Sequence, residues 1–105
     1  MNWLASPETD EDLIAGRNFI AADNESAALD FLDTAFEAFD LLAQFPEMGP
    51  RARFKHKGLK AVRYFVLAPP FNNWLVFYQP TVEGVEIKRV LYGSVNWRQE
   101  PERFF

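Results

Sequence analysis

The chain has 105 residues, 49% of them hydrophobic and 16% aromatic, which is enough apolar material for one modest core and argues against global disorder. With no cysteine and a single histidine, the sequence excludes disulfides, cysteine-based zinc sites and histidine-rich metal sites, and we expect neither a metal nor a cofactor. The net charge of −4 hides a division, because residues 1–50 carry eleven acids and one base whereas residues 51–105 carry ten bases and four acids. Such asymmetry predicts either two faces for partners of opposite charge or attraction between the two halves within the fold.

The N-terminus has neither the basic region nor the long apolar run of a signal peptide, and no apolar stretch reaches the roughly 18 residues needed to cross a bilayer. We therefore expect a cytoplasmic protein with no membrane association. The length favours a single domain, 1–105, whose tail at 98–105 is either loose or docked through Phe104 and Phe105.

The first predicted elements are a short strand at residues 3–5 and two helices. Ser6 is a natural N-cap and Pro7 a natural first helical residue, so a helix is expected over residues 7–22. Asn24 can cap a second helix over residues 25–44, which the Phe45-Pro46 step ends. A two-helix hairpin is therefore predicted.

The second helix carries one narrow polar stripe and is apolar almost everywhere else. The stripe consists of Asp30, Asp33, Glu37, Asp40 and Gln44. One of its two apolar flanks contains Phe31, Ala38, Leu41 and Phe45. A single sheet can cover only part of so wide an arc, so either the first helix or a partner protein must cover the remainder.

Three strand-like runs follow, at residues 59–67, 74–79 and 85–92, with connections short enough for antiparallel hairpins. The order strand, helix, helix, three strands favours an α+β fold in which the helical hairpin packs on one face of an antiparallel sheet.

Taken together and in order, these motifs resemble the RelE/ParE toxins of type II toxin–antitoxin systems over residues 3–97, and are closer to the ParE-like members. The similarity is strongest in the runs 74–80 and 85–93, which read WLVFYQP and VEIKRVLYG. The resemblance implies a short N-terminal strand and a two-helix hairpin packed on an antiparallel sheet that three C-terminal strands complete. It also implies a cognate antitoxin as partner in a hetero-oligomer, and the wide apolar arc then assigns antitoxin binding to Phe31, Ala38, Leu41 and Phe45.

Two activities occur in this family, namely binding of DNA gyrase and ribosome-dependent cleavage of messenger RNA. Many relatives end the last strand with His-Gly-x-Arg-Asp, where this chain has Tyr92-Gly93-Ser94-Val95-Asn96. That departure and the acidic balance favour the ParE-like activity, a toxin that binds a target such as gyrase. One alternative is a metal-independent endoribonuclease acting on the ribosome with Arg63, Arg89 and Tyr92 as catalytic residues. The other is a degenerate toxin that retains only antitoxin binding.

The segment from Arg51 to Lys60 is basic and irregular. Its cations could bind a target or phosphate groups, and the candidates are Arg53, Lys55, Lys57 and Lys60. The same cations could instead hold an acidic arm of the antitoxin or pair with the acidic stripe of the second helix. We interpret His56, between two lysines, as part of a solvated basic loop.

Overall fold

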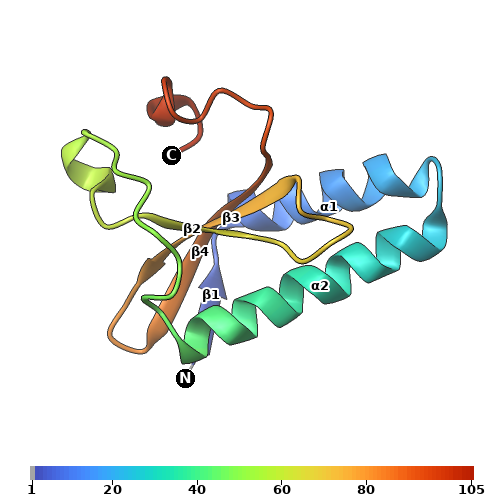
Figure 1. Ribbon diagram of the computed structural model, residues 1–105, viewed down its shortest axis with the longest axis horizontal. Coiled ribbons are helices and arrows are strands. Elements are labelled where there is room, and N and C mark those ends of the chain that lie inside the picture. The colour runs from blue at the N-terminus through green and yellow to red at the C-terminus, as the bar shows by residue number, and fades with distance from the viewer. Residues whose placement is uncertain (1) are drawn as a thin grey trace.

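The computed structural model describes residues 2–105, in which two helices lie across one face of a four-stranded sheet (Figure 1). In chain order the elements are β1 (Asn2–Ala5), α1 (Pro7–Ala21), α2 (Glu25–Gln44), the 3-10 turn η1 (Lys57–Leu59), β2 (Arg63–Val66), β3 (Trp74–Pro80), β4 (Gly84–Tyr92) and the 3-10 turn η2 (Pro101–Arg103). This order confirms the predicted α+β fold. None of the helices in the described part of the chain has the length and apolar character required to cross a bilayer.

Both helices begin where the sequence places their caps. The Ser6 hydroxyl accepts a hydrogen bond from the backbone N–H of Thr9, and the Asn24 side chain accepts one from the N–H of Ala27. Each bond satisfies an N–H group that has no partner inside its helix. Ser6 thus caps α1 directly after β1, and Asn24 caps α2 directly after the turn that ends α1.

The sheet has the strand order β1-β4-β3-β2, so the first and the last strand of the chain are neighbours. β2, β3 and β4 pair antiparallel, whereas β1 adds to β4 in parallel, with Trp3 opposite Val85. The sheet is therefore mixed. The β3–β4 register shifts between Phe77 and Tyr78, which pair with Arg89 and Ile87, and this bulge leaves Lys88 as the extra residue.

Each face of the sheet carries its own hydrophobic cluster. The helix-side cluster joins the sheet to α1 and α2, and its buried members are Leu13, Phe31, Ala35, Ala38, Phe39, Leu42, Ala43, Leu67, Phe71, Val76, Tyr78, Val85, Ile87 and Val90. The loop-side cluster lies on the opposite face, and its buried members are Ala52, Phe54, Leu59, Val62, Phe77, Leu91 and Trp97. Phe77 and Tyr78 belong to different clusters because successive residues of a strand point to opposite faces.

The C-terminal tail is docked on the loop side. The ring of Phe105 lies 5.4 Å from that of Phe54 and 5.1 Å from that of Phe77, measured between centroids. Arg89 donates a hydrogen bond of 3.0 Å from Nη1 to the carbonyl oxygen of Phe104. Of the two states expected for this tail, the structure shows the docked one.

Candidate functional site

Arg63 and Arg89, two of the predicted catalytic residues, emerge on opposite faces of the sheet. Arg63 pairs with Tyr78, which faces the helices, whereas Arg89 pairs with Phe77, which faces the loop side. The guanidinium of Arg63 donates hydrogen bonds of 3.1 and 2.7 Å to the carbonyl oxygens of Glu47 and Gly49. It therefore anchors the turn that follows α2.

All three guanidinium nitrogens of Arg89 donate hydrogen bonds within the protein. Its Nε and Nη2 each donate a 2.8 Å hydrogen bond to the carboxylate of Asp12 in α1, a bidentate ion pair, while Nη1 holds the tail. The same carboxylate accepts a 3.0 Å bond from the backbone N–H of Val90. The pKa of Arg89 is raised above its ordinary value, chiefly by the hydrogen bond to Asp12, and burial works against this rise. Here Arg89 joins α1, β4 and the tail.

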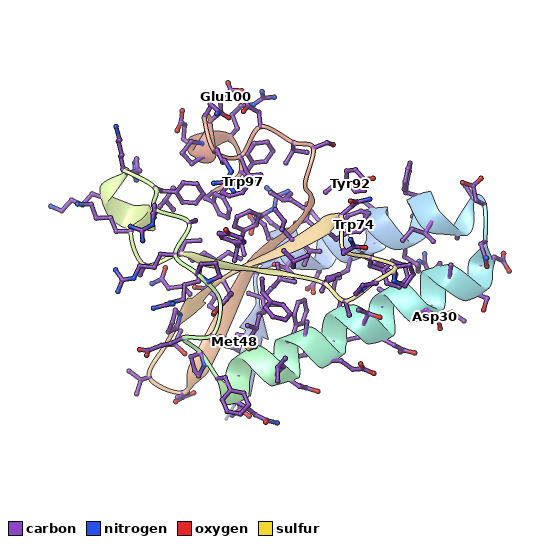
Figure 2. The ribbon with its side chains drawn as sticks, in the orientation of Figure 1. Asp30, Met48, Trp74, Tyr92, Trp97 and Glu100 are labelled. Carbon is purple, nitrogen blue, oxygen red and sulfur yellow. The ribbon has the colours of Figure 1, made fainter. Side chains whose placement is uncertain are left out.

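Tyr92 lies at the other end of the sheet from Arg63, on the helix side beside Trp74 (Figure 2). Its ring packs edge-on against Trp74 at a centroid distance of 5.2 Å, and its hydroxyl accepts a long, 3.4 Å hydrogen bond from Asn73. The structure therefore does not bring Arg63, Arg89 and Tyr92 together into one site. Val95 packs against the loop-side cluster.

The predicted phosphate-binding cations lie together on the loop that joins α2 to β2. We call residues 51–62 the basic loop. The side chains of Arg53, Lys55, Lys57 and Lys60 are all exposed, and Figure 2 shows nitrogen-tipped side chains extending outward around η1. Within residues 2–105, no ion pair involves any of these four residues, so the basic loop does not pair with the acidic stripe of α2.

The predicted antitoxin-binding residues of α2 are divided by the fold. Phe31 is fully buried, with its ring 4.9 Å from that of Trp74, and Ala38 is buried as well. These two residues face the sheet and present no surface to a partner, which corrects that part of the expectation. Leu41 and Phe45 are exposed, and for them partner binding stays a prediction.

An apolar groove opens between α1 and α2 on the side away from the sheet. It has a volume of about 510 Å³ and is lined by Asp10, Leu13, Ile14, Arg17, Leu32 and Phe36. The side chains of Ile14 and Phe36 are 56% and 41% exposed, a large fraction for residues of this size in a small protein. Sequence reasoning missed this groove, although Phe36 stands out beside Asp33 and Glu37 as an aromatic ring within the polar side of the helix.

The acidic stripe of α2 borders the same region. Asp30, Asp33, Glu37 and Asp40 are all exposed, and Figure 2 shows carboxylate-tipped side chains along the outer side of α2. Among residues 2–105, the only ion pair that joins the acidic half of the chain to the basic half is Asp12–Arg89. The two halves therefore present their charge largely on separate surfaces. No cluster of three or more potential metal-ligating side chains is found in the described part of the chain.

Comparison with known proteins gives two findings. Residues 4–97 match a family model described as the ParE toxin of the type II toxin–antitoxin system parDE. Among solved structures, the chain is similar to one of the chromosomal ParDE toxin–antitoxin system from P. aeruginosa, with a TM-score of 0.69 and 16% sequence identity. That similarity covers 88% of this chain and 95% of the other and shows a common fold. No significant match was found among curated proteins.

Proposed function

The chain belongs to the ParE toxin family of type II toxin–antitoxin systems, and from this membership we propose that it acts by binding DNA gyrase and is neutralised by a cognate antitoxin. The observation that carries the antitoxin part is the apolar groove between α1 and α2, with its exposed Ile14 and Phe36. An amphipathic segment of the antitoxin buries these side chains in the complex.

The groove has the composition of a binding surface for a helix. Its apolar residues lie one helical turn apart on α2, at Leu32 and Phe36, so a partner helix can insert side chains between them. The acidic stripe beside the groove favours a partner segment whose polar side carries lysine or arginine. Leu41 and Phe45 lie beyond that stripe and extend the proposed contact toward the end of α2.

The antitoxin contact is tested by neutralisation in growing cells. The chain is expressed with and without the antitoxin, the first candidate being the short reading frame that neighbours its gene. Phe36→Glu should leave the chain toxic and prevent rescue, because a carboxylate in the groove opposes burial by a partner. Val82→Glu is the matched control, since Val82 is fully exposed in the β3–β4 turn, and it should be rescued like the unmodified chain. Equal rescue of both variants would show that the partner binds elsewhere.

The proposed binding of gyrase is tested by determining which process the toxin stops, DNA maintenance or translation. Expression without antitoxin should block growth with DNA damage, and the full chain should inhibit supercoiling by purified gyrase. Arrested translation with cleaved transcripts and intact DNA would instead support the endoribonuclease alternative. Full antitoxin binding without any growth defect would identify a degenerate toxin.

A further inference from the structure

The basic loop is constructed so that its apolar side chains point inward and its cations point outward. Ala52, Phe54, Leu59 and Val62 are buried in the loop-side cluster. Next to and between these anchors stand five exposed cations, and residues 51–60 contain no acid; the cations are Arg51, Arg53, Lys55, Lys57 and Lys60. The loop therefore displays five positive charges on a chain whose net charge is −4.

The backbone beneath these cations is held in place. Residue 52 donates a 2.9 Å hydrogen bond to the carbonyl of Val62, and Arg51 bridges to Arg63 at the edge of β2. The ring of Phe54 lies 5.9 Å from that of Trp97. Arg53 has a φ of 61°, a left-handed conformation that a residue with a side chain adopts only where its surroundings impose it. A fixed backbone lowers the entropic cost of presenting the charges to a ligand.

A sixth cation lies at the base of the loop. Arg98 places its guanidinium carbon 4.2 Å from the centroid of the Trp97 ring, the same ring that packs against Phe54. Among residues 2–105, neither Arg98 nor any of the five loop cations forms an ion pair. The cations are therefore available for an external anion.

We propose that the basic loop binds the phosphate backbone of double-stranded nucleic acid. This goes beyond the proposed gyrase and antitoxin contacts and depends on neither of them. An acidic peptide is the less suitable ligand, because exposed ion pairs contribute only about 0–1 kcal/mol each and a stable peptide complex needs apolar anchors as well. The loop offers none, since its large apolar residues are buried. Nucleic acid needs no such anchors, because phosphate contacts release condensed counterions.

The aromatic residues of this region favour a duplex over a single strand. Single strands are held largely by stacking of bases on exposed aromatic rings. Phe54 and Trp97 are both buried, at 6% and 4% exposure, and Arg98 covers the Trp97 ring from outside. Cations on a protruding loop can follow phosphates without reading bases, so the expected binding is independent of nucleotide sequence.

The test measures binding of the full chain to fluorescently labelled duplex DNA and duplex RNA by anisotropy across a salt series. Lys57→Gln is compared with Arg17→Gln, which removes one exposed cation from α1 and changes the net charge equally. Lys57→Gln should reduce the slope of log K against log salt by about 0.9, which is roughly an eight-fold loss of affinity at 0.1 M salt. The double variant Lys55→Gln/Lys57→Gln should lose about twice that slope, and Arg17→Gln should bind like the unmodified chain.

Binding of either duplex with this pattern supports the proposal. Equal weakening by Arg17→Gln would overturn it, because the loop would then have no special part in binding. Tighter binding of polyglutamate than of both duplexes would identify an acidic protein as the ligand, and tighter binding of single strands would refute the duplex assignment. Circular dichroism of each variant checks that the fold is intact, and no gyrase or antitoxin is present in the assay.

Discussion

The helix-side and loop-side clusters lie on the two faces of one sheet, and the segments that cover these faces differ in secondary structure. Helices of 15 and 20 residues cover the first face, both begin at a side-chain cap, and α2 also has a regular apolar spacing. The second face is covered by the basic loop and the tail, in which the only regular elements are two 3-10 turns of three residues each. The loop side is held by its buried anchors, but it has little regular backbone hydrogen bonding, so we expect its local opening to cost less free energy than opening of the helix side.

The largest expected effect comes from emptying the helix-side cluster. Phe39 is fully buried, and its ring packs 5.0 Å from that of Trp3 on β1. Phe39→Ala should lower the free energy of unfolding by about 3–5 kcal/mol, measured by denaturant titration. Phe36→Ala, which truncates a ring that is 41% exposed on the same helix, should cost far less. Equal losses would contradict the assignment of Phe39 to the core.

A smaller loss is expected when the link between the two sides is cut. Asp12→Ala leaves the guanidinium of Arg89 without its carboxylate and the N–H of Val90 without its acceptor. The side chains of this pair are 20% and 12% exposed, so solvent moderates the loss to about 2–4 kcal/mol. Lys88→Ala, which removes the more exposed ion pair with Glu86, should change stability by less than about 1 kcal/mol. A small effect of Asp12→Ala would show that α1 is held by packing alone.

Truncating one side chain of the tail should distinguish most clearly between the stabilities of the helix-side and loop-side clusters. Phe105 is half-buried and contacts Phe54 and Phe77, so Phe105→Ala should cost about 1–3 kcal/mol. Amide hydrogen exchange should accelerate in residues 51–62, while α1 and α2 keep their protection. Faster exchange throughout both helices would show that the two clusters open together rather than separately.

Among the substitutions that remove a buried contact, the smallest effect is expected from deleting a single hydroxyl. Tyr78 is buried, and its oxygen accepts a 2.9 Å hydrogen bond from the N–H of Gly49, so Tyr78→Phe should cost about 1–2 kcal/mol.

Burial raises the pKa of Tyr78 above its ordinary value of 10.0, and the bond from Gly49 only partly opposes this. The unfolded chain therefore ionises first as the pH rises, and the contribution of Tyr78 is complete below about pH 10 and is lost as the pH rises through the folded pKa. Unfolding titrations between pH 8 and 11 should show this alkaline loss reduced in Tyr78→Phe.

The same comparison explains which parts of the fold could be predicted from the sequence. α2 was predicted to its bounds, Glu25–Gln44, because Asn24 and the Phe45-Pro46 step mark its ends and its apolar spacing is regular. The basic loop looked irregular because its buried residues follow no helical or strand period. The bulge at Lys88 likewise has no signal in the sequence, and it decides which face Arg89 occupies.

Site residues were harder to predict because they depend on how elements pack. The apolar arc of α2 is visible in the sequence, but which flank stays open depends on where α1 and the sheet lie. Phe31 and Ala38 face the sheet, whereas Phe36 borders the groove, and only the three-dimensional packing distinguishes them. For Arg63 and Arg89, chemistry suggested a shared site, and the strand register places them on opposite faces instead.

The parallel pairing of β1 with β4 has a consequence for folding of the chain during its synthesis on the ribosome. Residues 2–5 are synthesised well before their partners in the sheet, residues 84–87. Some 40 residues separate the end of α2 from β4, which corresponds to about 2–8 s of elongation at typical rates. During that interval the apolar sides of α2 have no completed sheet to cover them. A nascent chain of this kind is exposed to aggregation, and it is also accessible to an antitoxin already present before the toxin is complete.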